Sequence, residues 1–358
     1  MKGLDLYLAE VWHKQMGNAE LREYDNLARY GADQMIGYVD WEPHYWSKVA
    51  AIYENFELTK EGNVTEQLTF LSRTISTQYM LMEKYPNVPW HAAQLSKTLL
   101  RLHHFQKDLS TKDQDSLAVL LREQGIDSLE DETLRLSLQA AKIDFNNPMF
   151  YKIHAQNLLV LQRYDEAIEY YQKVLSLDPL ILDVYIPILK HYFYQDEYDK
   201  SLEYATRLSD QAKAQLLYKE FELNTPEGRL KKELIQADIQ ELKRYSVESL
   251  SIQAQILIKQ QKINEAFQSL LQLNQIAPDH DPSMLVLTNF LVRLKRWEQL
   301  TTQFDSRIPI QLSHPQILEN VLKAHQALGQ SQHSRDLLNR YHRQYPSTDL
   351  STLKAQYQ

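Results

Sequence analysis

The chain has 358 residues, and its 47 acidic against 39 basic residues give a formal net charge of -8. Only 8 glycines and 12 prolines accompany an apolar fraction of 43%, which favours an all-helical protein with a continuous core. The acidic balance argues against non-specific nucleic-acid binding, which needs a basic surface. Cysteine is absent, so disulfides and thiolate zinc sites are excluded.

Apolar and aromatic stripes at helical spacing fill the first 145 residues. Pro43 and Pro86 each end a predicted helix, and Trp46 and Trp90 follow near the start of the next one. This proline spacing predicts helical hairpins with a period of roughly 43 residues. The predicted helices cover 4–16, 24–39, 44–56, 68–85, 90–105 and 129–143, with polar inserts at 59–66 and 109–115.

Residues 32–58, ADQMIGYVDWEPHYWSKVAAIYENFEL, and 85–105, YPNVPWHAAQLSKTLLRLHHF, carry a narrower resemblance. They are similar to the soluble helical-repeat region that follows the membrane part of bacterial O-antigen ligase and polymerase-like glycosyltransferases. The resemblance covers residues 32–106 and rests on the Trp-Glu-Pro-x-Tyr turn at 41–45. It implies a soluble extracytoplasmic domain that serves cell-envelope glycan assembly. The membrane segments that carry that family's catalysis do not occur in the sequence, so no catalytic residue is transferred.

A pattern of about 34 residues begins at Pro148 and recurs to the C-terminal region. In the first copy, Ala155 and Ala167 take positions eight and twenty, and Pro179 follows its end. Further copies start at 182, 247, 281 and 315 without a change of register. This spacing is typical of a tetratricopeptide (TPR) helix-turn-helix, and the region resembles the TPR superfamily. The consensus glycine at position eight is missing from all five copies, which makes them divergent members.

The TPR resemblance implies an all-α solenoid, a right-handed superhelix of antiparallel helix pairs. Residues 212–246 break the register, although Thr225 and Pro226 mark a helix start. Apolar residues at helical spacing from Leu230 to Tyr245 predict one long helix there, either a degenerate repeat or a bridge between two blocks. The predicted organisation is 1–145 divergent TPR-like hairpins, 146–211 two TPR units, 212–246 the irregular repeat or bridging helix, 247–347 three TPR units, and 348–358 a C-terminal tail. This tail is polar and forms either a cap or a loose end.

In the TPR superfamily, positions five, nine and thirteen of each first helix line the concave face. Every copy in this chain places one basic residue at such a position, although the protein is acidic overall. This pattern predicts a groove that receives carboxylates or an acidic peptide segment. The alternative is that these charges only solvate an exposed helix face. The predicted partner-binding residues are Lys152, Gln156, Lys190, Tyr194, Gln255, Lys259, Asn289, Arg293 and Lys323.

No sequence motif predicts catalysis, a cofactor or a metal. His103 and His104 are adjacent on a predicted helix and point about 100° apart, so they cannot ligate one ion together. Asp279, His280 and Asp281 lie in a predicted loop, where these residues are ordinary turn and cap residues. A hidden enzyme in the N-terminal half would need a deep pocket with convergent titrating groups.

The sequence therefore predicts a non-catalytic TPR scaffold or adaptor that binds protein or peptide partners through its concave face. The alternative is an extracytoplasmic TPR domain that serves O-antigen ligase-like glycan assembly. No apolar run is long enough to cross a membrane. Asp5 and Glu10 interrupt the first apolar stretch, which is therefore not a signal peptide. We expect a cytoplasmic protein without direct membrane insertion, or a periplasmic or extracytoplasmic one if an upstream signal or membrane segment was removed.

Overall fold

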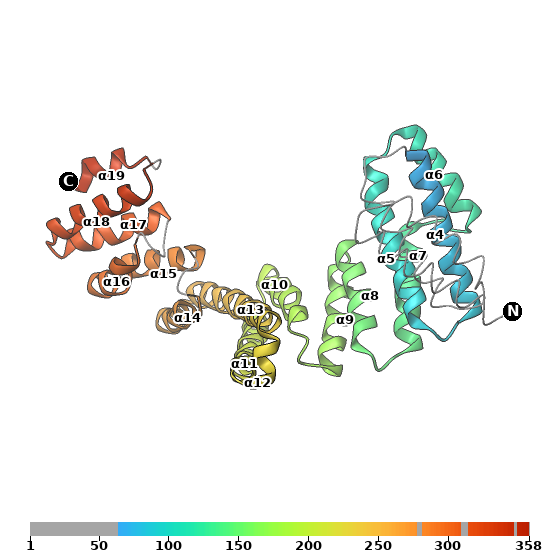
Figure 1. Cartoon of the computed structure of the whole chain (residues 1–358), viewed down its shortest axis with the longest axis horizontal. Helices are drawn as coiled ribbons and strands as arrows, with labels where there is room; N and C mark the ends of the chain where they lie inside the picture. Colours follow the sequence, from blue (N-terminus) through green and yellow to red (C-terminus); the bar gives the residue numbers. More distant parts are fainter. Residues whose placement is uncertain (1–63, 278–280, 309–313, 347–348, 358) are drawn as a thin grey trace. The chain divides into compact units, whose positions relative to one another are not determined.

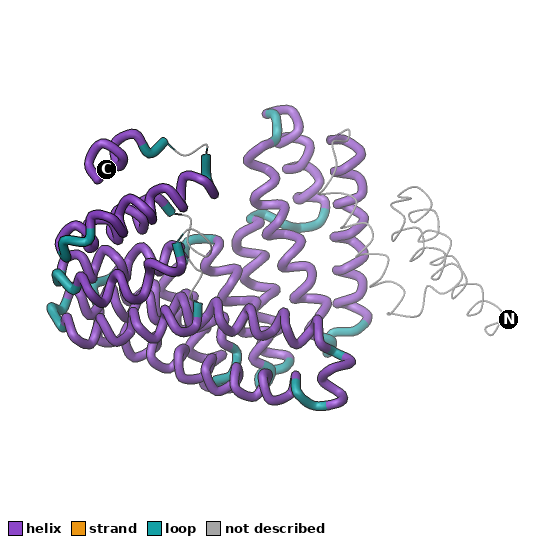
Figure 2. The backbone as a smooth tube through the Cα atoms, turned by 60° about the vertical axis from the view of Figure 1, so that its left-hand side comes forward, coloured by secondary structure: helices purple, strands orange, loops and turns teal. Residues whose placement is uncertain are grey.

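The computed structural model describes residues 64–277, 281–308, 314–346 and 349–357. These ranges consist of helices joined by short loops, without a strand (Figure 2). The chain divides into two compact units, Met1–Pro179 and Leu180–Gln358, and each is described by itself. Among the described helices, none is both long enough and apolar enough to cross a membrane.

Five of the six described helices of the first unit share one apolar core, and the sixth packs against the last of these five (Figure 1). Helix α5 contacts α4, α7 and α8, so it lies at the centre of the unit. Phe150 of α8 is fully buried, and the Trp90 ring of α5 meets it edge-on with ring centroids 4.8 Å apart. The elements are α4 (Val64–Lys84), α5 (Pro89–Phe105), η1 (Gln106–Asp108), α6 (Thr111–Glu123), α7 (Leu129–Ile143), α8 (Pro148–Val160) and α9 (Tyr164–Leu177).

Helix α6 corrects the prediction of a polar insert at 109–115. Ser110 caps the helix, because its hydroxyl accepts a hydrogen bond from the Asp113 amide at 3.3 Å. Leu117 and Leu120 then turn an apolar face into the core. The insert prediction was wrong because the first turn of α6 is polar and its apolar face begins only in the second turn. The predicted helices at 68–85, 90–105 and 129–143 match α4, α5 and α7 closely. The predictions for the first 63 residues lie outside the described residues.

The second unit also has one continuous core, which runs from Leu250 on α13 to Tyr357 on α19. Leu350 and Tyr357 are buried in it, so residues 350–357 pack on the last helix pair as a cap. The elements are η2 (Leu182–Val184), α10 (Tyr185–Tyr194), α11 (Tyr198–Leu223), α12 (Pro226–Leu230), α13 (Lys232–Lys259), α14 (Ile263–Ile276), α15 (Asp281–Arg293), α16 (Trp297–Phe304), η3 (Asp305–Arg307), α17 (Pro315–Ala327), α18 (Ser331–Gln344) and α19 (Ser351–Tyr357).

Five helix pairs share the same turn at the same repeat position, which confirms the predicted register. Each first helix ends in a Schellman motif, as in the bonds from the Arg163 amide to the Leu158 carbonyl (2.9 Å) and from the Gln162 amide to the Leu159 carbonyl (3.1 Å). The residue at position fifteen has a positive φ in every copy, between 54° and 71°. These residues are Gln162, Asp196, Gln261, Lys295 and Gly329. The all-α class built from antiparallel helix pairs is therefore confirmed for the described residues.

The irregular segment 212–246 is built from extensions of two repeat helices. Helices α11 and α13 have 26 and 28 residues, against 13 and 14 in α8 and α9. Thr225 caps α12 as predicted, with its hydroxyl 3.0 Å from the Gly228 amide. A Cβ at position 228 would lie 1.9 Å from the Glu222 carbonyl oxygen, so only glycine fits this turn. Helix α13 then runs without a break into the first helix of the copy at 247.

Candidate protein-interaction surface

The nine predicted partner-binding residues all lie on first helices of their pairs. Lys152 and Gln156 lie on α8 of the first unit, whereas the other seven belong to the second unit. Of these seven, Lys190 and Tyr194 lie on α10 and Gln255 and Lys259 on α13. Asn289 and Arg293 lie on α15, and Lys323 lies on α17. Each is exposed or half-buried, as residues of an accessible helix face must be.

A hollow of about 400 Å³ between α10 and α13 brings three of them together. Tyr194, which is 77% exposed, lies on its rim together with the other α10 residues. Polar and apolar side chains of α13 form the opposite wall, so the hollow offers both kinds of contact. It is lined by Lys190, Phe193 and Tyr194 from α10 and by Arg244, Val247, Glu248, Ser251, Ile252 and Gln255 from α13.

The charges of this hollow are partly compensated within the protein. The Lys190 ammonium forms an ion pair with the Glu248 carboxylate across the two helices, and the two side chains are 44% and 26% exposed. The Arg244 guanidinium lies 3.4 Å from a Glu241 carboxylate oxygen and 5.0 Å from the centroid of the Tyr245 ring. The lining residues thus carry two cations and one carboxylate.

Lys259 has a different environment, because its ammonium binds the turn between α10 and α11. It donates a hydrogen bond to the Tyr198 hydroxyl at 2.8 Å, and this bond raises the pKa of Lys259. The same ammonium lies 4.9 Å from the ring centroids of Phe193 and Tyr198. Next to it, the Gln260 amide donates to the Asp199 carboxylate at 3.0 Å. The end of α13 is thereby fastened to the preceding helix pair.

The remaining predicted residues of the second unit also contact their own helices and neighbours. The Asn289 carbonyl oxygen accepts a hydrogen bond from the Asn320 amide at 2.7 Å. The Lys323 ammonium lies 2.5 Å from the Glu319 carboxylate, one turn away on α17. Arg293 is exposed, and it makes no ion pair with any residue that the structure describes. Sequence periodicity identified the exposed face but not these partners.

The described part of the first unit holds one buried serine–histidine pair. The Ser137 hydroxyl lies 2.8 Å from Nδ1 of His154, and it donates to the Thr133 carbonyl at 2.9 Å. Burial lowers the pKa of His154 to about 4, so the imidazole is neutral. Ser137 is 0% and His154 4% exposed. No substrate could reach these atoms in this conformation, and the pair contributes to packing of α7 against α8.

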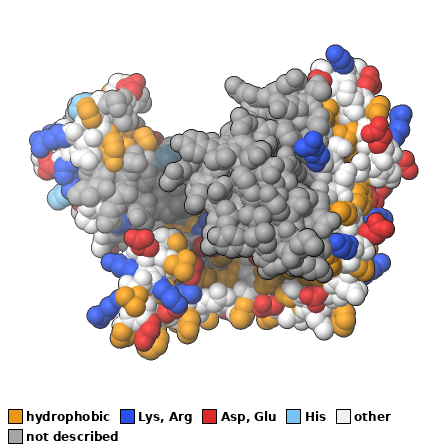
Figure 3. Space-filling model, turned by 45° about the vertical axis from the view of Figure 1, so that its right-hand side comes forward, with side chains coloured by type: hydrophobic (Ala, Val, Ile, Leu, Met, Phe, Trp, Pro, Cys, Tyr) orange, Lys and Arg blue, Asp and Glu red, His pale blue; other side chains and the backbone are white. Residues whose placement is uncertain are grey.

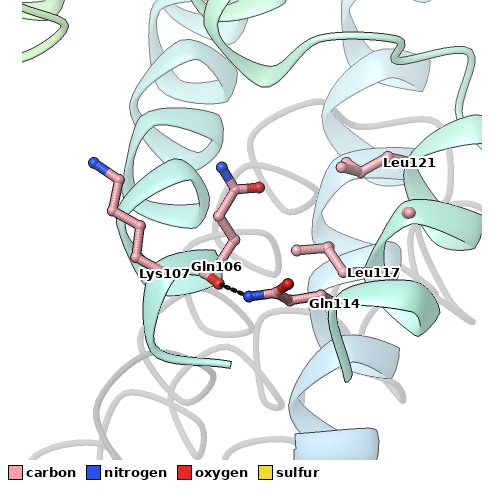
Figure 4. Close-up of a pocket in the computed structure, with 6 residues that line it drawn as sticks. Gln106, Lys107, Gln114, Leu117 and Leu121 are labelled. Carbon is pink, nitrogen blue, oxygen red and sulfur yellow. Dashed lines mark hydrogen bonds between the residues drawn. The ribbon is translucent and has the colours of Figure 1, made fainter. Parts of the chain in front are cut away.

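A separate hollow of about 330 Å³ lies between η1 and α6 of the first unit (Figure 4). The Gln114 amide donates to the Gln106 carbonyl at 3.2 Å across it, and Leu117 and Leu121 form its apolar side. Lys107 is the one titrating side chain among the described residues that line it. The described lining residues therefore do not form the convergent set of acids and bases that proton transfer requires.

The histidines that the sequence analysis considered do not belong to a metal-binding cluster of described residues. His103 Nε2 is 3.5 Å from a Glu130 carboxylate oxygen, while burial lowers the pKa of His103. Within the described ranges, no cluster of three or more potential ligands could hold a metal ion. Asp279 and His280 lie outside the described residues, whereas Asp281 is the first residue of α15 and so does not belong to the predicted loop.

Comparison with known proteins gives a family for part of the chain. Residues 155–181 match the model of the tetratricopeptide repeat family. No curated protein matches the sequence. Similar solved structures include MamA from Desulfovibrio magneticus, with 12% identity, a TM-score of 0.41 and coverage of 58% of this chain and 97% of that one.

Two further solved structures have the same level of similarity. YrrB, a TPR protein with an unusual peptide-binding site, is 12% identical at a TM-score of 0.39 over 62% of this chain and 97% of its own. The C-terminal part of a TPR repeat-containing protein from Cytophaga hutchinsonii is 12% identical at a TM-score of 0.45, over 79% and 98%. Similarity this low says nothing of a partner. The family match identifies a tetratricopeptide repeat at residues 155–181, and the five described helix pairs share one turn position with it.

Proposed function

We propose that this chain is a non-catalytic scaffold that binds an extended peptide segment of a partner protein across the hollow between α10 and α13. TPR proteins in general serve as protein-interaction scaffolds. The observation that supports this particular surface is that Lys190, Tyr194 and Gln255 line a single hollow.

The hollow suits a peptide side chain in size and in chemistry. Its volume of about 400 Å³ falls within the range of roughly 300–1,000 Å³ that is usual for ligand pockets. Phe193, Val247 and Ile252 provide apolar area, while Ser251 and Gln255 provide hydrogen-bond donors and acceptors. A peptide that lies along α13 would place an apolar side chain in the hollow and its backbone against the polar groups.

The charges favour a peptide that carries a carboxylate beside this apolar side chain. An exposed ion pair contributes only about 0–1 kcal/mol, so a ligand carboxylate can replace Glu248 as the partner of Lys190 at small cost. Arg244 supplies a second cation on the opposite wall, which α13 forms. Lys259 is assigned to the packing of α13 against the preceding pair, since Tyr198 already binds its ammonium.

Two variants on opposite walls test this proposal. Peptides selected from a random display library on the full chain would be titrated against Lys190→Glu, which reverses a charge, and Ser251→Trp, which fills the hollow. We expect each variant to weaken binding at least about tenfold, or about 1.4 kcal/mol. Lys323→Glu makes the same charge change on α17 and is the matched control. Circular dichroism verifies that helicity is unchanged.

The outcome of the Ser251→Trp titration decides the site. Peptides that bind this variant as tightly as the native chain do not occupy the hollow, and the proposed function would then be wrong for this surface. Loss of binding in Lys323→Glu alone would transfer the site to α17.

A further inference from the structure

Five exposed apolar side chains cluster in sequence where α11 and α13 extend beyond the length of a repeat helix. We call this set the hairpin-tip patch. Its members and their exposed fractions are Leu217 (61%), Tyr218 (64%), Phe221 (71%), Leu230 (89%) and Leu234 (64%). Large apolar side chains scattered singly on a surface need no explanation, but the largest apolar patch on a protein is often functional, and these five residues lie within 18 positions of the sequence.

The patch has one dominant face on α11. Leu217 and Phe221 are four residues apart and therefore neighbours on the helix surface, with Tyr218 beside them. Ala212, which is fully buried, marks the opposite side that packs on the rest of the unit. The Lys219 ammonium is 2.9 Å from the Asp238 carboxylate and so joins the last turns of α11 to the first turns of α13. Leu234 precedes Asp238 by one turn and consequently lies near the end of α11.

The exposed apolar area of the patch matches one half of a stable dimer interface. With about 200 Å² for a whole aromatic side chain and about 120 Å² for a leucine, the five residues expose about 500 Å². A standard interface buries about 800 Å² on each partner, and about 57–65% of it is non-polar. The non-polar part of such an interface is therefore also about 500 Å² on each partner, which equals the exposed apolar area of the patch.

The charges around the patch favour a second copy of this chain over a strongly charged partner. Residues 213–238 contain five basic and five acidic residues, so this segment has no net charge in a protein of net charge -8. On the coloured part of the face that Figure 3 shows, basic, acidic and hydrophobic side chains are interspersed in the same way. A neutral surface of mixed sign neither repels its own copy nor selects an acidic or basic ligand.

We propose that the hairpin-tip patch is a self-association surface through which two copies of the chain form a two-fold symmetric dimer. In such an interface the same face is used on both subunits, so residue 217 of one copy contacts residue 221 of the other when the two α11 helices cross antiparallel. The contact uses the outer face of α11 and the tip formed by α12 and the start of α13. It does not involve the hollow between α10 and α13.

Light scattering on the full chain during size-exclusion chromatography, with sedimentation velocity from about 1 to about 100 µM, tests the proposal. We expect a mass of twice the 42.2 kDa of one chain at the upper concentration. The double variant Leu217→Glu, Phe221→Glu places four like charges in the contact and should raise the dissociation constant at least about 100-fold. Tyr194→Glu is compared with the single variant Phe221→Glu as a matched control, because both put one carboxylate on an aromatic position of similar exposure and only Phe221 belongs to the patch.

Cross-linking examines the geometry independently, since the native chain has no cysteine. Leu217→Cys chains mixed with Phe221→Cys chains should form a disulfide-linked pair on mild oxidation, and a Tyr194→Cys chain mixed with either should not. A monomer at every concentration would overturn the proposal. So would a dimer that withstands the double glutamate variant or is lost equally in Tyr194→Glu. Tyr194 lines the peptide hollow, whereas Leu217 and Phe221 do not. Loss of dimerisation and loss of peptide binding are therefore detected by different variants.

Discussion

Substitution of Gly329 by alanine isolates the energetics of the turn that every helix pair shares. Gly329 has a φ of 71°, and a Cβ at this position would meet nothing within 4 Å. Its conformation is fixed by the bonds from the Gln330 amide to the His325 carbonyl (2.8 Å) and from the Gly329 amide to the Gln326 carbonyl (3.0 Å). The alanine methyl group therefore adds no clash, and only the backbone preference changes.

The expected magnitude follows from two opposing effects. A residue with a Cβ in the left-handed conformation is destabilised by roughly 1–2 kcal/mol. Alanine also lowers the conformational entropy of the unfolded chain, which stabilises the folded protein by about 0.4–1 kcal/mol. We therefore expect Gly329→Ala to lower the free energy of unfolding by about 1 kcal/mol. Gln162→Gly, at the same repeat position in the first unit, should have the opposite sign and a similar or smaller size.

Urea unfolding followed by circular dichroism measures the change, and hydrogen exchange localises it. Amides of α17 and α18 should exchange faster in Gly329→Ala, while those of the first unit remain unchanged. Gly329→Asn is a useful control, because asparagine tolerates the left-handed region better than alanine and should lose less stability. A Gly329→Ala protein as stable as the native chain would refute the argument from backbone strain.

Three other predictions concern buried groups. The hydrogen bond to Asp305 (3.4 Å) raises the pKa of His325 in the folded protein. Protonated His325 therefore stabilises the fold fully below its usual pKa of 6.5, and this stabilisation is lost as pH rises through the raised pKa. Asp305→Asn should remove this pH dependence of stability in thermal melts from pH 5 to 9. Burial lowers the pKa of His154 to about 4, so the stability that the neutral ring contributes to the fold is lost as pH falls from 6.5 towards 4. NMR titration should show a neutral ring at pH 6. Phe150→Ala should lower the free energy of unfolding by about 3–5 kcal/mol in urea titrations.

The regular helix pairs could be predicted from the sequence because local rules determine them. Pro148 starts α8, and Pro179 follows α9. Two exceptions have physical reasons. Helix α6 begins with a polar turn capped by Ser110, so its first residues have no apolar periodicity. Helix α13 has no glycine or proline near Val247, and the helix therefore continues through a boundary that the repeat count had placed there.

The site was less predictable because its interactions join distant parts of the chain. Repeat position identified Lys190 and Gln255 as surface residues, and both line the hollow. It could not show that Glu248 neutralises Lys190 or that Tyr198 binds Lys259, since these contacts depend on how α10 and α11 pack against α13. A pattern of charges along a repeat therefore indicates an accessible face, whereas the charge that remains available to a partner depends on the tertiary contacts.

The structure also explains how the repeats retain their geometry without the consensus glycine at position eight. In each of the five described pairs, positions eight and twenty are both almost fully buried. The two positions pair Ala155 with Ala167, Leu189 with Ser201, Ala254 with Ala266, Thr288 with Leu300, and Leu322 with Ser334.

Three of these pairs have a leucine at one position and a serine or threonine at the other, and the remaining two have alanine at both. The Ser201 hydroxyl donates to the Leu189 carbonyl at 2.7 Å, so the second helix approaches the backbone of the first directly at this point. Helix separation depends on the side chains at the contact, and two leucines at both positions would force the helices apart. The two positions therefore share an upper limit on size, because none of the five pairs has a large residue at both. This is a physical reason why five copies keep one register while only residues 155–181 match the family model.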